Sequence, residues 1–190
     1  MAAKSSFKNM TLCLLTICLV CSALLALVSH LTADPIAEAQ QKKTKATLAQ
    51  VLPEFEKAES EVVTMGGNDF VCYTASVDTS VVGYAIVSPV IGFGGTLELM
   101  VGFDEAGRIW STSVLSHNET PGLGANCTDP AFKGQFDRFD PAEKVLQVRK
   151  DGGHIDAITA STITSRAYCK AVEQACRVYQ TLTVKEESHE

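Results

Sequence analysis

Basic residues are scarce in this chain of 190 residues, which contains 16 Lys and Arg against 22 Asp and Glu. Lys4 and Lys8 precede an apolar run, so the remainder of the chain has 14 basic and 22 acidic residues and a net charge of −8. A protein that binds nucleic acid presents basic patches to the phosphates. The charge balance therefore argues against nucleic acid as a partner.

Common catalytic and nucleotide-binding motifs are also absent. The sequence has no P-loop, no G-x-G-x-x-G fingerprint, and no Ser/His/Asp or Cys/His arrangement at a recognisable spacing. Among the four cysteines after residue 31 (Cys72, Cys127, Cys169 and Cys176) there is no C-x-x-C and no zinc-like pairing. These absences give little sign of an independent substrate site.

Four cysteines follow the apolar run. Cys169 and Cys176 share a predicted helix face but stand two turns apart, about 10 Å by helical rise, which is too far for a disulfide. A bridge between Cys72 and Cys127 is left open, since an oxidising compartment would permit it.

Charged residues are missing altogether from residues 10–31, a run of 22 residues. As a helix this run reaches about 33 Å, enough to cross a hydrocarbon core of roughly 30 Å. Lys4 and Lys8 place residues 1–9 in the cytoplasm and everything after the run outside it. A cleaved signal peptide is the alternative, with Ala37-Glu38-Ala39 as its cleavage site, but its apolar part is normally only about 7–15 residues long.

The remainder reads as one domain behind a short connection. Residues 32–46 predict a polar linker or a frayed helix start, residues 47–184 a folded domain, and residues 185–190 a solvated acidic tail. Helical spacing continues through residues 47–60, with Pro53 as a kink or boundary.

Short β-like runs bounded by Gly and Pro fill the middle of the domain, and a helix closes it. They predict strands at residues 81–87, 96–103, 108–115, 144–148 and 154–158. Asp104-Glu105-Ala106-Gly107 fits a hairpin turn. Apolar residues from 165 to about 183 recur at helical spacing. We therefore expect an α+β domain with a twisted, mostly antiparallel sheet packed by helices.

The most informative stretch is residues 156–165, D-A-I-T-A-S-T-I-T-S, which carries five hydroxyl side chains just before the C-terminal helix. A hydroxyl at a helix N-terminus caps the helix, or it holds a phosphate where free N–H groups and the helix dipole favour an anion. Both interpretations are open from composition alone.

A second motif precedes it. Residues 117–125 read H-N-E-T-P-G-L-G-A. This loop resembles the E-T-P-G-L-G loop of the FMN-binding domain in the G subunit of the Rnf electron-transport complex, and in the C subunit of the sodium-pumping NADH:quinone reductase. Residues 156–165 fall where that family carries its flavinylation motif, D-x-x-S-G-A-T-x-T-S. The single N-terminal span and the order of the motifs agree, so the resemblance covers nearly the whole chain.

The resemblance implies a membrane-anchored electron carrier with one covalent FMN, in an ion-translocating ferredoxin:NAD oxidoreductase. Its partners would be the iron–sulfur and flavin subunits of that complex, the bacterial cytoplasmic membrane and a flavin transferase acting outside the cytoplasm. The coupling ion (Na⁺ or H⁺) and the direction of electron flow are not encoded in recognisable residues. The rival functions are a stand-alone anchored flavoprotein reductase and a non-redox anchored module.

By position, the resemblance assigns the phosphoester to Thr162. Ala160 stands where the family has Gly, so the turn has to form with a Cβ present. Ser161 stands where the family has Ala and is the alternative attachment oxygen. The residues assigned to cofactor binding are Glu119, Thr120, Gly122, Leu123, Gly124, Thr159, Ser161, Thr162 and Thr164.

Structural roles remain open beside these assignments. Thr159, Thr164 and Ser165 also suit capping and local backbone hydrogen bonds. The glycines of the loop suit a tight turn, and Glu119 and Thr120 either contact the cofactor edge or brace the loop. Other polar residues near the motifs have alternatives of the same kind: Asp156 is read by the transferase or holds the loop, His117 and His154 tune the flavin or are structural, and Trp110 is core or stacks on the ring.

Overall fold

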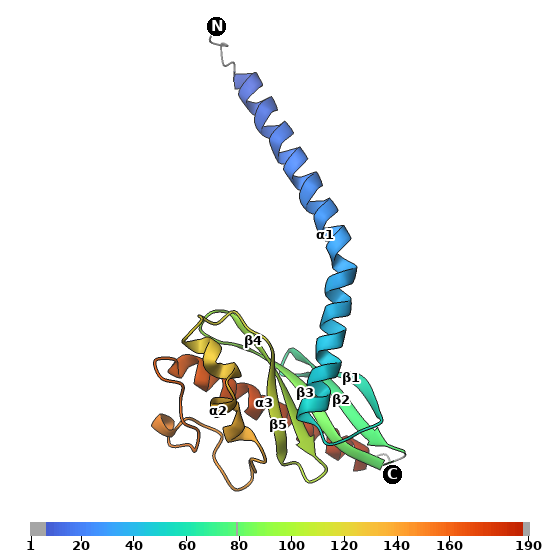
Figure 1. Cartoon of the computed structure of the whole chain (residues 1–190), viewed down its shortest axis with the longest axis vertical. Coiled ribbons are helices and arrows are strands. Elements are labelled where there is room, and N and C mark those ends of the chain that lie inside the picture. The colour runs from blue at the N-terminus through green and yellow to red at the C-terminus, as the bar shows by residue number, and fades with distance from the viewer. Residues whose placement is uncertain (1–6, 79, 188–190) are drawn as a thin grey trace. The chain divides into compact units, whose positions relative to one another are not determined.

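The computed structural model describes residues 7–78 and 80–187. The chain divides into two units, Met1–Lys43 and Thr44–Glu190, which are described separately below. Helix α1 (Phe7–Val51) runs through the boundary between them. Figure 1 shows α1 and the mixed α and β elements that follow it.

The N-terminal unit consists of α1 alone within the described residues, and its most apolar window has a mean hydropathy of 2.7 with none of it buried. Hydroxyl groups in this helix are satisfied locally, because Thr16 donates to the Leu12 carbonyl at 2.6 Å and Thr32 to the Val28 carbonyl at 2.8 Å. A helix that satisfies its own polar groups and exposes apolar side chains suits a lipid environment.

The predicted linker at residues 32–46 is helical in the structure. Helix α1 continues through Pro35 and ends only at Val51. Ala, Gln, Lys and Glu dominate this stretch, and their high helix propensity supports the helix although they are polar. The expected cytoplasmic end at residues 1–9 lies mostly outside the described residues, as do residues 188–190 of the expected acidic tail, whose residues 185–187 are helical.

The second unit is built on one five-stranded sheet, whose strands follow the chain order. The strands are β1 (Lys57–Met65), β2 (Asn68–Val77), β3 (Ser80–Ile91), β4 (Thr96–Asp104) and β5 (Ile109–Ser116). Every neighbouring pair is antiparallel, as expected where short turns join successive strands. The α+β class with an antiparallel sheet is thus confirmed, and so is the hairpin turn at Asp104–Gly107, where Gly107 donates to the Asp104 carbonyl at 3.0 Å with φ 78°.

Helix α3 (Thr162–Glu187) covers one face of the sheet (Figure 1). Tyr168, Val172 and Ala175 on its apolar stripe are fully buried. This stripe confirms the predicted C-terminal helix, which begins three residues earlier than expected. Packing of this stripe on the sheet places the start of α3 at one end of the domain.

The other face of the sheet is covered by the C-terminal end of α1. Leu48 and Val51 pack with Leu52 against strand residues that include Ala85 and Met100. Gly102 makes the approach possible, because a Cβ there would overlap the Val51 carbonyl. The sheet is therefore packed on both faces.

Three local expectations were wrong. The helix predicted over residues 47–60 ends at Val51, since Pro53 has no N–H to continue it, and β1 begins at Lys57. The strands predicted at 144–148 and 154–158 reduce to one isolated bridge between Val148 and Ile155, because the turn around the 3-10 helix Arg149–Asp151 takes up the Val148 carbonyl.

Candidate functional site

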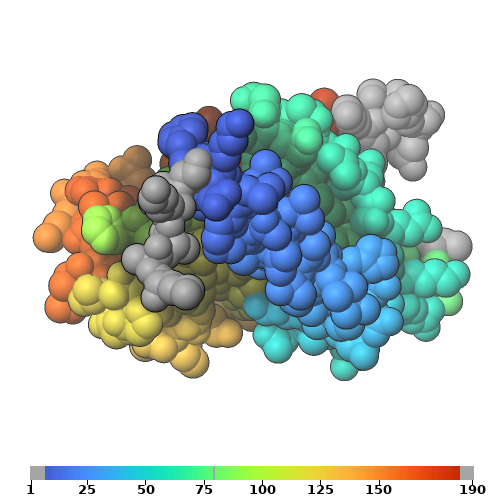
Figure 2. Space-filling view, turned by 90° about the horizontal axis from the view of Figure 1, so that it is seen from above, coloured from blue at the N-terminus to red at the C-terminus, as the bar shows by residue number. Residues whose placement is uncertain are grey.

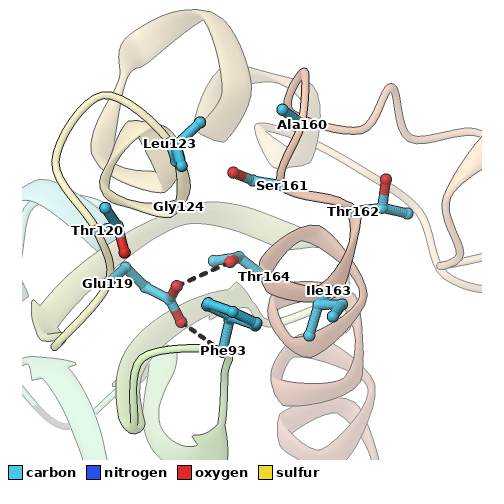
Figure 3. A pocket seen from close by; sticks show the side chains of 10 residues that line it. All are labelled: Phe93, Glu119, Thr120, Leu123, Gly124, Ala160, Ser161, Thr162, Ile163 and Thr164. Carbon is cyan, nitrogen blue, oxygen red and sulfur yellow. Dashed lines mark hydrogen bonds between the residues drawn. The ribbon is translucent and has the colours of Figure 1, made fainter.

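A cavity of about 380 Å³ opens at one end of the second unit, where three segments distant in sequence meet. These are the β3–β4 turn, the loop after β5 and the start of α3. Figure 2 shows the light-green turn at the surface among the yellow and orange atoms of the other two segments. Its lining residues are Phe93, Glu119, Thr120, Leu123, Gly124, Ala160, Ser161, Thr162, Ile163 and Thr164 (Figure 3).

The turn before α3 has an unusual backbone. Ser161 donates its N–H to the Ile158 carbonyl at 3.0 Å, and between them Ala160 has a φ of 59°. A positive φ at the third residue of such a turn is typical of type II, in which glycine is preferred. Ala160 adopts this conformation despite its Cβ.

The start of α3 presents open donors. Ser165 is the first residue of the helix whose N–H is hydrogen-bonded. It donates to the Ser161 carbonyl, four residues earlier, at 3.1 Å. The N–H groups of Thr162, Ile163 and Thr164 precede that bond and have no acceptor in the described part of the chain. Such groups, together with the helix dipole, favour an anion at this point.

The Ser165 side chain stabilises the turn before α3 by two hydrogen bonds to the backbone. Its hydroxyl donates to the Ser161 carbonyl at 3.0 Å and accepts the N–H of Ile158 at 2.9 Å. The side chain is fully buried. Ser165 therefore has the local backbone-bonding role that was the alternative for it.

The other hydroxyls differ in what they bond. Thr162 is half-buried and Ser161 is buried, and neither hydroxyl has a hydrogen-bond partner among residues 7–78 and 80–187. In Figure 3 the Ser161 hydroxyl points toward Leu123, whereas the Thr162 hydroxyl points away from Glu119. Thr164 is buried and donates to Glu119. Thr159 is exposed and lies outside the cavity lining.

Glu119 joins the three segments of the site. Its Oε1 accepts the N–H of Phe93 at 2.8 Å and that of Gly94 at 3.3 Å, and its Oε2 accepts the Thr164 hydroxyl at 2.9 Å (Figure 3). The residue is 6% exposed. His117 supports it, since its Nδ1 accepts the N–H of Glu119 at 3.3 Å. Glu119 thus braces the loop, which was one of its two expected roles.

The two loop glycines have different surroundings. Gly124 lines the cavity, and a Cβ there would overlap Glu119 Oε2 and lie 2.7 Å from Thr164 Oγ1. Gly122 has φ 74° with open space around it and does not line the cavity. Gly122 therefore serves the turn, and Gly124 serves the close packing beneath the cavity.

Two apolar lining residues were missed from the sequence. Phe93 is 70% exposed and Ile163 is 53% exposed, and with Leu123 they form an apolar rim. Phe93 stands between glycines in the run Ile91-Gly92-Phe93-Gly94-Gly95, and an aromatic residue in a glycine-rich turn was the available sequence indication. Large apolar side chains that stay in solvent around a cavity are typical of a binding site.

Several other residues have structural partners. Trp110 lies outside the cavity lining with the Arg138 guanidinium 4.4 Å from its ring centroid, and His154 Nδ1 accepts the N–H of Val145 at 3.1 Å. Asp156 pairs with Arg149 at 2.8 Å in solvent. His154 therefore has a structural partner. Trp110 is half-buried, so it is neither a core residue nor part of the cavity lining.

The cysteines of the domain are free thiols, including Cys72 and Cys127, whose bridge had been left open. Burial, reinforced by the carboxylate of Glu119, raises the pKa of the Cys127 thiol to about 11. Burial likewise raises the pKa of Cys72 to about 12. Buried thiols of this kind are unreactive.

The sequence matches two protein families along its length. Residues 92–177 match the FMN-binding domain, and residues 1–51 match the RnfG N-terminal region. The fold and the cavity thus belong to an FMN-binding domain that follows an N-terminal apolar helix.

Curated relatives cover almost the whole chain. The G subunit of a proton-translocating ferredoxin:NAD(+) oxidoreductase complex from Clostridium ljungdahlii is 32% identical over 93% of this chain and 91% of its own length. The G subunit of an ion-translocating oxidoreductase complex from Methanosarcina acetivorans is 34% identical over 92% of this chain and 95% of its own length. The chain belongs to this family of RnfG proteins.

Solved structures of related folds were also found. The C subunit of the Na(+)-translocating NADH-quinone reductase from Parabacteroides distasonis is 19% identical, with a TM-score of 0.47 over 68% of this chain and 77% of its own. The NqrC structure from Shewanella oneidensis is 20% identical, with a TM-score of 0.46 over 66% of this chain and 65% of its own.

Proposed function

We propose that this chain is a membrane-anchored electron-transfer subunit of an ion-translocating ferredoxin:NAD oxidoreductase complex, and that it carries FMN esterified through its phosphate to Thr162. One observation supports this most: the 117–126 loop and the hydroxyl-rich start of α3 meet at one cavity, although about 40 residues separate them. Membership of the RnfG family supports the complex and its ion-translocating role.

The residues of the cavity fit both ends of FMN. A phosphodiester keeps one negative charge, for which the open N–H groups of Thr162, Ile163 and Thr164 are suitable donors. Phe93 and Leu123 offer apolar surface to a flat ring system. Bound flavin supplies the redox chemistry, and the chain contributes position, donors and exclusion of water on one side.

A covalent bond would keep the flavin on the protein, which the helix dipole alone would not do. The helix dipole stabilises an anion by only about 0.3–1 kcal/mol in a typical exposed setting. A cofactor held by that alone would be lost outside the membrane. An ester bond to the chain removes dissociation altogether.

Thr162 is the better of the two unbonded hydroxyls. Its position matches the family motif, it is half-buried, and a transferase could reach it. Ser161 is only 7% exposed, and its hydroxyl points toward Leu123 in Figure 3. Ser161 therefore remains the second candidate.

Helix α1 supports the membrane anchor, and Lys4 and Lys8 before the apolar run support its orientation. The RnfG N-terminal match includes residues 1–51, so the apolar helix lies within the matched region. We place residues 1–9 in the cytoplasm, the span at residues 10–31 in the bacterial cytoplasmic membrane, and the flavin domain (residues 47–184) outside the cytoplasm. The other complex subunits and a flavin transferase on that side are the expected partners.

The test is flavin fluorescence after denaturation. Full-length protein purified from its native membrane is run on a denaturing gel, and fluorescence in its band is expected. A matured protein without fluorescence would favour a non-redox anchored module. Fluorescent protein that never co-purifies with the other subunits would favour the stand-alone reductase.

A further inference from the structure

We propose that Glu119 is a positioning residue that shapes the cavity and keeps the Thr164 hydroxyl from receiving the flavin phosphate. This inference rests on the proposed function. It assigns two effects to one carboxylate: Glu119 fixes the segments around the cavity, and it removes Thr164 from competition with Thr162.

The bracing effect follows from the contacts of the two carboxylate oxygens. One oxygen accepts N–H groups from Phe93 and Gly94 at 2.8 and 3.3 Å, and the other accepts the Thr164 hydroxyl at 2.9 Å. The β3–β4 turn and the first turn of α3 are therefore tied to the same side chain. Room for it is reserved by Gly92 and Gly124, where a Cβ would overlap Glu119 oxygens. Hydrogen bonds to a buried charged group are among the stronger ones in proteins.

The choice of Thr162 over Thr164 follows from the hydrogen bond that Thr164 donates and from the negative charge of Glu119. The Thr164 hydroxyl donates its only hydrogen bond to Glu119 Oε2, and Thr164 is 1% exposed. A phosphodiester on that oxygen would place its negative charge beside the carboxylate, where a shielded setting strengthens repulsion. Thr162 lies two residues earlier, about 200° around the helix, and its hydroxyl points away from Glu119 (Figure 3).

Attachment of FMN to Thr162 requires an activated flavin donor. Esterification of FMN by a free hydroxyl in water would have to expel water, so the donor has to be a flavin dinucleotide that contains a phosphoanhydride. The Thr162 oxygen attacks the FMN phosphorus, the anhydride bond breaks, and a nucleoside monophosphate leaves. The hydroxyl proton passes to a base of the transferase. No electrons are exchanged.

Two substitutions separate the two effects. Glu119→Gln keeps an oxygen that accepts the Phe93 N–H and an amide that donates to Thr164, so it retains the brace without the charge. Glu119→Ala removes both. Glu173→Gln is the matched control, because it removes a carboxylate of α3 that pairs with Arg177 in solvent.

Attachment is measured on full-length protein in detergent after co-expression with a flavin transferase. Trypsin releases residues 151–166, and fragment masses locate the FMN on that peptide. The ratio of Thr164-linked to Thr162-linked FMN is expected to rise at least about tenfold in Glu119→Ala, which removes the charge and uncovers the Thr164 hydroxyl, and to stay unchanged in Glu173→Gln. An unchanged ratio in Glu119→Ala would overturn the selective role.

The brace is measured without flavin. In the full-length chain made without a transferase, amide hydrogen exchange at Phe93 and Gly94 is expected to accelerate by about tenfold in Glu119→Ala, and little in Glu119→Gln. Equal exchange in Glu119→Ala and the unsubstituted chain would overturn the brace. This arm is independent of the proposed function, which fails instead if the unsubstituted chain acquires no covalent flavin.

Discussion

Replacing Ala160 with glycine should stabilise the domain, because this residue is held at φ 59°. The left-handed conformation costs a residue with a Cβ about 1–2 kcal/mol relative to its usual backbone. Glycine in turn loses about 0.4–1 kcal/mol more chain entropy on folding than alanine does. The net expectation is a gain of about 0.5–1 kcal/mol in the free energy of unfolding. For a domain of this size that corresponds to a rise in Tm of about 1–4 °C.

Trp110 provides the assay, since it is the single tryptophan of the sequence and lies within β5. Its fluorescence follows unfolding of the domain in the full-length protein in detergent, without interference from the apolar helix. Ala142→Gly is the control, because Ala142 is exposed and has no positive φ, so glycine there should lower Tm. A fall in Tm for Ala160→Gly of the same size as in the control would refute the strained turn.

Three further predictions concern the interior of the domain. Tyr168→Phe removes the buried 2.8 Å hydrogen bond to Thr112 and should lower the free energy of unfolding by about 1–3 kcal/mol in a denaturant titration. Burial raises the pKa of Cys127 to about 11 and that of Cys169 to about 12, so at pH 8 on the order of one thiol in a thousand or fewer is ionised. Alkylation of these thiols, followed by peptide mapping, should therefore require denaturation, and labelling within minutes in the native protein would contradict their burial. Gly124→Ala introduces a Cβ into the carboxylate brace and should reduce covalent flavin to roughly a tenth or less while costing about 1–3 kcal/mol of stability. Full flavin occupancy in that variant would mean that the brace is not needed.

Periodic segments were predictable because their patterns are local. The stripe containing Tyr168, Val172 and Ala175 repeats at helical spacing and indicated α3 directly. The strand runs that became β3, β4 and β5 were bounded by turn residues, and Gly107 marked the hairpin between the last two. In each case the neighbours along the chain are also the partners in space.

Segments whose conformation depends on distant partners were not predictable in the same way. Residues 154–158 have β-like composition, yet only Ile155 finds a bridge partner, because the remaining backbone is taken up by turns and by Gln135, which bonds both the N–H and the carbonyl of Asp156. Polar residues 32–46, for which a linker or a frayed helix start was expected, continue helix α1.

The site residues also divide into those that local sequence predicts and those that depend on distant partners. Its two motifs could be read from the sequence, and so could the special backbone demanded at position 160. The bond between Glu119 and Thr164 could not, since it spans 45 residues and carries no periodic pattern. Phe93 was missed for the same reason, because it reaches the cavity only through the pairing of β3 with β4.

Mass mapping of residues 151–166 shows directly whether Thr162 carries FMN. Protein from its native membrane should show the FMN mass on Thr162, and Thr162→Ala should lose it while Trp110 fluorescence reports an intact domain. Ser161→Ala should keep it. An FMN mass that persists in Thr162→Ala, or that disappears in Ser161→Ala alone, would contradict the assignment.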